Sequence, residues 1–160
     1  MTLVEGGDGK DRITAEGEDT GDDTLEGNSG GDFVGGGAGN DFIVGGTRGD
    51  GVGASEDAGN DTLEGGEGDD IIIAGNYDTA TGAVVNTGSG DNLIIAGTGN
   101  DSVFGDDGLD VVGAGTGDDN ISAAGGDDKV FVSFGQDQVG GDRGKATPVG
   151  GGVAAPLEGG

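Results

Sequence analysis

Aspartate recurs along this chain at intervals that are mostly nine residues long, and carboxylates at so regular a spacing can bind cations. The sequence GGAGNDFIV at residues 36–44 is representative, because glycines precede Asp41 and the apolar Ile43 follows two positions later. We number GGDGKDRIT, residues 6–14, as positions one to nine and align the other units on the acidic position six. The position-six residues, all candidate metal ligands, are Asp11, Asp23, Asp32, Asp41, Asp50, Asp61, Asp70, Asn92, Asp101, Asp110, Asp119, Asp128 and Asp137.

The composition limits what these residues can bind. The chain has 160 residues, with 43 glycines, 32 acidic residues, 6 basic residues and a formal net charge of −26. It has no histidine and no cysteine, which excludes imidazole and thiolate ligands and leaves hard oxygen donors. The negative charge repels phosphate backbones and anionic lipid, so neither nucleic acid nor membrane insertion is expected. The N-terminal MTLVEGGDGK lacks the basic start and apolar core of a cleavable signal peptide.

A glycine-rich acidic composition is also typical of disordered chains, and position eight distinguishes a folded repeat from a disordered chain. A disordered chain has no reason to keep this position apolar, yet every unit does so, and Val4 falls at the same phase. The spacing is irregular near residues 15–17, 54–55 and 74–86, which we expect to be loops. The position-eight residues are Ile13, Leu25, Val34, Ile43, Val52, Leu63, Ile72, Val84, Ile94, Val103, Val112, Ile121, Val130 and Val139.

Each unit reads as a turn followed by a very short strand, because glycine, aspartate and asparagine favour turns and β-branched residues favour strands. One turn reverses the chain once, so two units, 18 residues, close a coil, and successive coils stack as parallel strands. Alternation along each strand directs position eight inward. The sequence therefore predicts an all-β parallel roll of about seven coils, a β-solenoid, over residues 1–140.

In such a roll the position-six carboxylates form two columns of like charge, one at each edge. Ca²⁺ between successive turns would neutralise them, since it accepts six to eight oxygens in flexible geometry, whereas Mg²⁺ requires a tighter octahedron. We expect about eight or more Ca²⁺ ions and folding that depends on them. Asn92 should weaken two sites, and the irregular stretch should interrupt the second column. The eight expected pairs are Asp11–Asp32, Asp32–Asp50, Asp50–Asp70, Asp110–Asp128, Asp23–Asp41, Asp41–Asp61, Asp101–Asp119 and Asp119–Asp137.

These units resemble the RTX (repeats-in-toxin) nonapeptides of the hemolysin-type calcium-binding family, G-G-x-G-x-D-x-U-x with U apolar. GGDGKDRIT, GGAGNDFIV and GGEGDDIII match this pattern in full, whereas Arg48, Leu109 and Asn92 depart from it. The resemblance covers residues 6–140 and implies a right-handed parallel β-roll that folds on Ca²⁺. It also implies type I secretion with an uncleaved C-terminal signal, and thus a secreted, extracellular or cell-surface protein. In that family the repeats usually accompany a separate enzymatic, pore-forming or adhesive domain.

No catalytic centre is expected, because the serines have no imidazole partner. The leading hypothesis is a structural protein that self-associates into oligomers or filaments, either through exposed coil ends or through an apolar outer face. The opposite face reads as more polar, with Thr24, Glu26, Thr62 and Glu64. The residues predicted to form the apolar face are Phe33, Ile71, Ile73, Leu93, Ile95, Val111 and Phe131.

Two alternatives remain open at this point. The chain could be the calcium-folding module of a larger hydrolase, epimerase or adhesin of the same family. It could also bind ice, although position three varies too much for a flat threonine ladder. The glycine-rich tail at residues 141–160 is either a cap, with Pro148 ending the stack, or a secretion signal.

Overall fold

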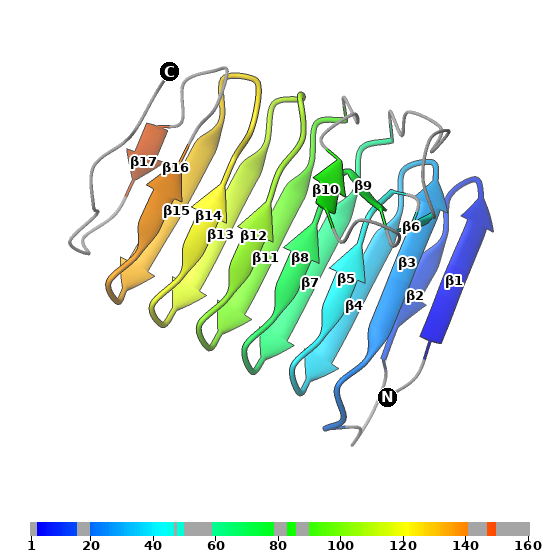
Figure 1. Cartoon of the computed structure of the whole chain (residues 1–160), viewed down its shortest axis with the longest axis horizontal. Helices are drawn as coiled ribbons and strands as arrows, with labels where there is room; N and C mark the ends of the chain where they lie inside the picture. The colour runs from blue at the N-terminus through cyan, green and yellow to red at the C-terminus, as the bar shows by residue number, and fades with distance from the viewer. Residues whose placement is uncertain are drawn as a thin grey trace.

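The computed structural model describes residues 3–15, 20–46, 48–49, 59–78, 83–85, 90–140 and 147–149. Every regular element in these ranges is a β-strand. None of the described residues forms a helix long and apolar enough to cross a membrane. Figure 1 shows the strands in two layers, and the chain passes from one layer to the other at each turn.

Two seven-stranded sheets, in which all neighbouring strands are parallel, make up the two layers. Sheet A consists of β1 (Leu3–Asp8), β3 (Thr24–Ser29), β5 (Phe42–Val44), β8 (Ile71–Ile73), β12 (Ser102–Phe104), β14 (Asn120–Ser122) and β16 (Gln138–Gly140). Sheet B consists of β2 (Arg12–Thr14), β4 (Phe33–Ala38), β7 (Thr62–Glu67), β11 (Leu93–Thr98), β13 (Val111–Thr116), β15 (Lys129–Phe134) and β17 (Thr147–Val149). The predicted parallel β-roll of seven coils is confirmed.

The core lies between the sheets and is built from the predicted position-eight residues. In sheet A, for example, Val103 is in register with Ile72 on one side and Ile121 on the other. Val4 is 37% exposed because β1 is the first strand of sheet A and no described strand covers its other side. The position-eight residues confirmed as buried are Ile13, Leu25, Val34, Ile43, Leu63, Ile72, Ile94, Val103, Val112, Ile121, Val130 and Val139.

Position one also faces the core, which the sequence analysis missed. The alternation that buries position eight also buries position one, two residues later; position one lies within the longer strands of sheet B and just after the shorter strands of sheet A. The larger residues found there are Ala74, Ala96, Ala114, Ala123 and Val132, all buried. The interior therefore contains a second row of small side chains in addition to the predicted one.

The prediction that every coil has 18 residues is wrong. Strand β4 pairs with β7 and not with the unit at residues 45–53, so Val34 is in register with Leu63. That unit is therefore part of a long connection from β5 to β7, and Asp50 and Val52 within it lie outside the described residues. The next connection on the same edge, from β8 to β11, is also long.

These two long connections contribute a third, small sheet, which we call the lateral sheet. It consists of β6 (Arg48–Gly49), β9 (Asn76–Asp78) and β10 (Ala83–Val85), with β9 in the middle. β9 and β10 are antiparallel, and Val84 pairs with Tyr77. Val84 was predicted to lie in the core stack and residues 74–86 to be an irregular loop; both predictions are wrong.

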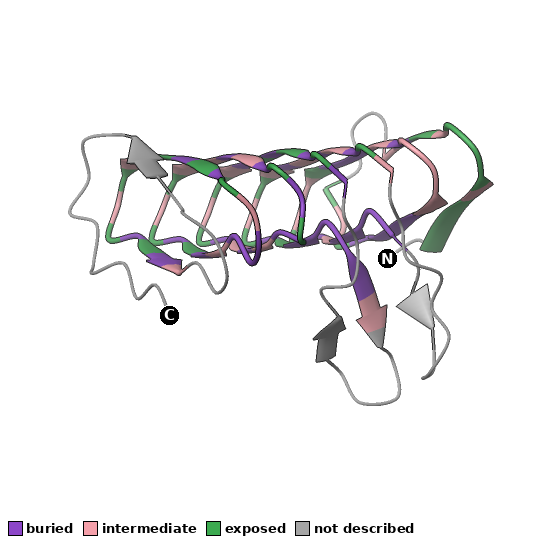
Figure 2. Cartoon of the chain, turned by 90° about the horizontal axis from the view of Figure 1, so that it is seen from above, coloured by how far each residue is buried: buried purple, intermediate pink, exposed green. Residues whose placement is uncertain are grey.

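The lateral sheet stands beside the N-terminal half of the roll, where Figure 2 shows β9 projecting away from it. The rings of Phe42 on β5 and Tyr77 on β9 meet edge to face, with centroids 5.0 Å apart. Near this contact, the outward-directed residues Val44 and Ile73 are 0% and 1% exposed. The long connections therefore cover part of the outer surface of sheet A.

The predicted apolar face does not exist as one surface. Ile71 and Ile73 belong to sheet A, and between Phe33 and Leu93 on sheet B stands β7 with Thr62 and Glu64. The long connections shift the order of strands, so residues assigned to one face from uniform coils fall on two. The members of the predicted face that belong to sheet B are Phe33, Leu93, Ile95, Val111 and Phe131.

Candidate metal centre: two columns of buried aspartates

The position-six residues form two hydrogen-bonded columns, one along each edge of the roll. In each column the backbone N–H of one residue donates to Oδ1 of its counterpart in the next coil, over 2.8 to 3.2 Å. Column one is Asp11, Asp32, Asp61, Asn92, Asp110 and Asp128. Column two is Asp23, Asp41, Asp70, Asp101, Asp119 and Asp137.

Some of the predicted neighbours are confirmed and others are wrong. The pairs Asp11–Asp32, Asp110–Asp128, Asp23–Asp41, Asp101–Asp119 and Asp119–Asp137 are hydrogen-bonded as expected.

The errors all arise at the long connections. Asp32 pairs with Asp61 and not with Asp50, and Asp41 pairs with Asp70 and not with Asp61. Asp70 then pairs with Asp101, so the second column continues past the irregular stretch that was expected to interrupt it. The predicted column order Asp32–Asp50–Asp70 is therefore wrong. Asp32 belongs to column one and Asp70 to column two, at opposite edges of the roll.

The second carboxylate oxygen of these residues has an unusual environment. Oδ2 of Asp70 and Oδ2 of Asp101 are buried, accept no hydrogen bond, and belong to residues only 1% exposed. A buried charged oxygen without a partner is costly, and such oxygens are rare in stable proteins. Further buried Oδ2 atoms without a hydrogen-bond partner belong to Asp11, Asp119, Asp128 and Asp137.

Backbone carbonyl oxygens of the next coil lie near the same position-one residues as these Oδ2 atoms. A Cβ added to Gly27 would lie 2.5 Å from the Gly45 carbonyl oxygen and 2.7 Å from Oδ2 of Asp32. At Gly36, beside column two, the added Cβ would lie 2.9 Å from the Gly65 carbonyl oxygen and closer still to Oδ2 of Asp41. Oxygens from two successive coils therefore lie beside the same position-one residue.

Glycine at position four is required for the coils to approach this closely. Gly117 has φ 138°, and a Cβ there would overlap the carbonyl oxygen of Gly99 in the preceding coil. Gly99 N–H in turn donates to the Thr116 carbonyl at 3.0 Å. The left-handed backbone and the missing side chain together bring the turns into register, which aligns the aspartates behind them.

Burial changes the acidity of the columns. Desolvation, reinforced by neighbouring carboxylates, raises the pKa of Asp70 and of Asp110 to about 7 and that of Asp119 to about 6. Burial likewise raises the pKa of Asp101 and of Asp128. Each shift reports an environment that disfavours an isolated negative charge, which either a proton or a cation could relieve.

The donor set restricts which cation fits. Within the described part of the chain, no group of three or more acidic side chains gathers around one point. A cation between two turns would therefore take carboxylate oxygens from two successive coils and complete its shell with backbone carbonyls. All of these donors are hard oxygens, the ligand type that Ca²⁺ prefers.

Two features of the columns were missed by the sequence analysis. Asp106 is 2% exposed, and its N–H donates to Oδ2 of Asp110 at 3.1 Å while its Oδ1 accepts the Gly108 N–H. An outer ladder of position-five side chains also runs beside column two, joined by the same N–H to Oδ1 bonds. Its members are Asp22, Asn40, Asp69, Asn100, Asp118 and Gln136. The recurrence of Asp and Asn at position five could have predicted this outer ladder, but the sequence analysis considered position six alone.

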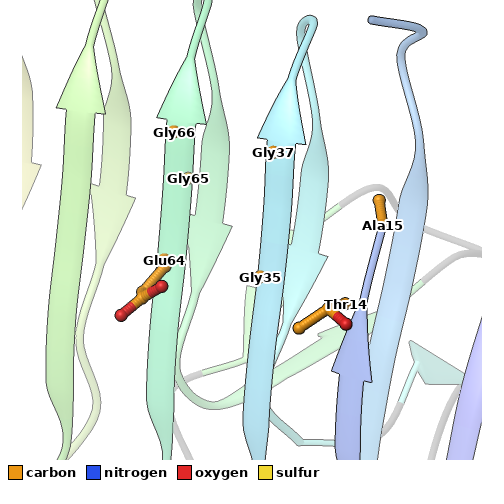
Figure 3. Close-up of a pocket in the computed structure, with 7 residues that line it drawn as sticks. All are labelled: Thr14, Ala15, Gly35, Gly37, Glu64, Gly65 and Gly66. Carbon is orange, nitrogen blue, oxygen red and sulfur yellow. The ribbon is translucent and has the colours of Figure 1, made fainter. Parts of the chain in front are cut away.

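One hollow lies apart from the columns, on the outer face of sheet B. Its volume is about 180 Å³, and it is lined by Thr14, Ala15, Gly35, Gly37, Glu64, Gly65 and Gly66. Figure 3 shows Thr14 and Glu64 on either side of the strand that carries Gly35, which has no side chain to fill the space between them. The hollow contains no convergent set of polar groups comparable with the columns.

Comparison with known proteins gives one match. A family model described as the RTX calcium-binding nonapeptide repeat, in four copies, matches residues 19–47, 57–76, 86–121 and 104–139. The matched segments contain eleven of the twelve residues of the two columns, all except Asp11, and so include column two in full. No curated protein and no solved structure gave a significant match.

Proposed function

Because the chain belongs to the RTX calcium-binding nonapeptide repeat family, we propose that it is a secreted structural module that Ca²⁺ folds outside the cell. The observation that carries this proposal is the repetition of buried, unpartnered Oδ2 atoms along both edges, as at Asp101 and Asp119. One such oxygen could be local strain, but a row of them in successive coils calls for a row of counterions.

Charge explains why the fold should depend on the metal. The chain has a formal net charge of −26, and each column brings carboxylates within one strand spacing of each other. The apolar interior is only two rows deep on each sheet and cannot offset both this repulsion and the entropy of ordering the chain. Binding of Ca²⁺ to the folded state alone would supply the missing free energy.

The same reasoning favours an extracellular location. Sites assembled from two carboxylates and backbone carbonyls correspond to the weak end of calcium sites, roughly 10⁻⁴ to 10⁻³ M, which fill outside cells. Cytosolic free Ca²⁺ would leave them empty, so the chain would pass through a secretion system unfolded and fold after export.

The test is a Ca²⁺ titration of chelator-stripped protein followed by far-ultraviolet circular dichroism and by size-exclusion chromatography. We expect β-structure and compaction to appear together as Ca²⁺ rises into the millimolar range, with Mg²⁺ at equal concentration much less effective. A chain that is equally compact and β-rich without divalent ions would contradict the proposal.

Self-association through sheet B is a further part of the proposed function. Leu93 and Ile95 on β11 and Phe131 on β15 are 41 to 44% exposed. On β13, between these strands, Val111 is in register with Leu93 and Lys129, and Gly113 is in register with Ile95 and Phe131. We call Leu93, Ile95, Val111 and Phe131 the sheet B patch. Contiguous exposed apolar side chains on so charged a chain favour a partner surface, and Ca²⁺ binding would reduce the repulsion between two copies.

The coil ends are less suited to head-to-tail stacking than the sheet B patch. Position-seven N–H groups point to the preceding coil, as Lys129 N–H does to the Asp110 carbonyl, so position-eight N–H groups point to the following one. In β17, the last strand of sheet B, position eight is Pro148, which is in register with Val130 and has no N–H to donate. A second copy stacked on this end would lose a ladder hydrogen bond.

Light scattering in millimolar Ca²⁺ tests the association. The intact protein should form a discrete oligomer, and Phe131→Ser should reduce it to monomer. Phe104→Ser, on sheet A, is the matched control and should leave the oligomer intact. A monomeric intact protein would rule out self-association without affecting the calcium-folding proposal.

Ice binding is a second candidate, favoured by the exposed outer ladder beside column two. Asn100 and Asp118 of that ladder are regularly spaced, and Thr98 and Thr116 at position three are in register with each other. Glu67 and Phe134 occupy position three in other coils and break the flat surface that ice binding needs. Absence of thermal hysteresis in millimolar Ca²⁺ would eliminate this candidate.

A further inference from the structure

Asn92 is the one described position in the two columns that is not an aspartate, and its polar groups are satisfied by the protein itself. Its N–H donates to Oδ1 of Asp110 at 3.0 Å, and its Oδ1 accepts the Asp61 N–H at 2.9 Å. Its side-chain Nδ2 donates to the Gly90 carbonyl at 3.1 Å. Asn92 is 2% exposed, so this is a buried amide with a donor where the other coils bury a carboxylate oxygen.

In the next coil of column one, both side-chain oxygens of Asp110 also accept hydrogen bonds from the protein. Asp110 places its Oδ2 within 3.1 Å of the Asp106 N–H, whereas Oδ2 of Asp101 and Oδ2 of Asp119 in column two have no donor. The space between Asn92 and Asp110 thus has a protein hydrogen bond on both sides. Nothing in it calls for a cation.

The surrounding coils also have an apolar support that the others lack. Asn92 ends the connection that carries β9 and β10, so it lies where the lateral sheet rejoins the roll. Val44 and Ile73, at position nine of β5 and β8, are fully buried, whereas Phe104 and Ser122, at position nine of β12 and β14, are partly exposed. Packing therefore contributes most to the β5–β8 region, next to Asn92.

We infer that the Asn92 coil is a metal-free joint in the roll: Ca²⁺ occupies the spaces between successive aspartates, but neither of the two spaces that Asn92 borders. This inference rests on the proposed calcium-dependent folding and specifies where that dependence stops. The two columns contain ten hydrogen-bonded neighbour pairs. The spaces within the two pairs that include Asn92 hold no Ca²⁺.

Two physical effects keep these spaces empty. Replacing a carboxylate by an amide removes one unit of negative charge from each space, and with it the repulsion that a cation relieves. The amide also presents N–H hydrogens, which carry positive partial charge and cannot coordinate a cation. Column two has no such residue and should be metal-bound along its described length.

The experiment compares the intact protein with Asn92→Asp and Asp101→Asn, using equilibrium dialysis of ⁴⁵Ca²⁺ at saturating concentration. Asn92→Asp should bind up to two more ions than the intact protein, because it creates two carboxylate-lined spaces. Asp101→Asn is the matched control in column two and should bind up to two fewer. Asn92→Asp should also need more Ca²⁺ than the intact protein before it folds.

Hydrogen exchange on the intact protein provides an independent readout that does not require the variants to fold. The amides of Asp61 and Asn92, whose hydrogen bonds to Oδ1 bridge the two spaces beside Asn92, should lose less protection on partial Ca²⁺ removal than the amides of Asp101 and Asp119. Equal loss at the two edges, or an unchanged ion count in a folded Asn92→Asp, would overturn the metal-free joint while leaving calcium-dependent folding in place. An intact protein that binds no Ca²⁺ would instead overturn the proposed function.

Discussion

The backbone N–H of Asp101 donates to Oδ1 of Asp119 at 3.0 Å, although the two residues are 18 positions apart in the chain. One oxygen of Asp119 therefore joins two coils, while the other, Oδ2, is buried with no hydrogen-bond partner. The carboxylate of Asp119 thus has one oxygen that joins coils and one that we propose binds Ca²⁺, and the two roles can be separated by mutation.

Replacing Asp119 by asparagine or by alanine should separate these roles. Asp119→Asn keeps an Oδ1 acceptor for Asp101 and removes a buried charge, so at limiting Ca²⁺ it should be more stable than Asp119→Ala. In saturating Ca²⁺, Asp119→Asn should bind fewer ions. Asp119→Ala loses both the ladder bond and the ligand and should be destabilised in either condition, by about 1 to 3 kcal/mol.

Urea denaturation at limiting and at saturating Ca²⁺ measures both effects, and Asp118→Asn on the exposed outer ladder is the control. If Asp119→Asn and Asp119→Ala behaved identically at limiting Ca²⁺, the ladder bond would have no measurable role.

The metal-free protein should be more stable in acid than at neutral pH. Burial raises the pKa of Asp70 and Asp110 from 3.8 to about 7, so the folded state binds these protons more tightly than the unfolded state does. Their contribution to stability is complete below about pH 3.8 and is lost as pH rises through about 7. In chelator-stripped protein, which we propose is unfolded at neutral pH, β-structure measured by circular dichroism should increase as the pH is lowered from about 8 to about 4.

Ca²⁺ should reverse this dependence. The ion competes with protons for the same carboxylates, so its apparent affinity should increase as pH rises through the same interval. Stability in excess Ca²⁺ should then be higher at pH 8 than at pH 5. A β-structure content of the metal-free protein that does not change between about pH 8 and about pH 4 would show that protonation of the buried carboxyls does not stabilise the fold.

Gly117→Ala should disrupt the stacking of the turns. A Cβ at Gly117 would overlap the Gly99 carbonyl oxygen, and the residue has φ 138°, which is strained for any other amino acid. We expect a loss of at least about 2 kcal/mol in saturating Ca²⁺, measured by urea denaturation. Gly113→Ala, in the same coil, is the control: its added Cβ would come no closer than 3.8 Å to the Ile94 carbonyl oxygen.

Phe42→Ala should loosen the lateral sheet without dissolving the roll. The ring contact with Tyr77 is the one aromatic pair among the described residues, and such pairs contribute about 1 kcal/mol beyond burial. Hydrogen exchange should accelerate at β9 and β10 and change little at β13 and β14. Phe104→Ala, on β12 two strands away from β5 in sheet A, should leave β9 and β10 unaffected. Acceleration by both variants would indicate a general loss of stability.

The sequence by itself determined the repeating unit. Glycine at position four, aspartate at position six and an aliphatic residue at position eight are each dictated by local physics: a left-handed turn, a metal or ladder oxygen, and alternation along a strand. From these, the two-layer roll, its buried residues such as Ile94 and Val103, and the existence of two aspartate columns could be predicted. Regular neighbours such as Asp101 and Asp119 followed directly, because 18 residues return the chain to the same edge.

Only the tertiary structure decided which coils are neighbours across the irregular stretches. The nonapeptide-like sequence at residues 45–53 satisfies the local pattern, but Asp32 pairs with Asp61, 29 positions away, and leaves that unit in a side connection. Lengthening a surface connection costs little free energy, so local sequence cannot distinguish a weak repeat from an insertion. Register is fixed by strand pairing between distant residues such as Val34 and Leu63, and that pairing assigned Ile71 and Phe33 to opposite faces and brought the lateral sheet next to Asn92.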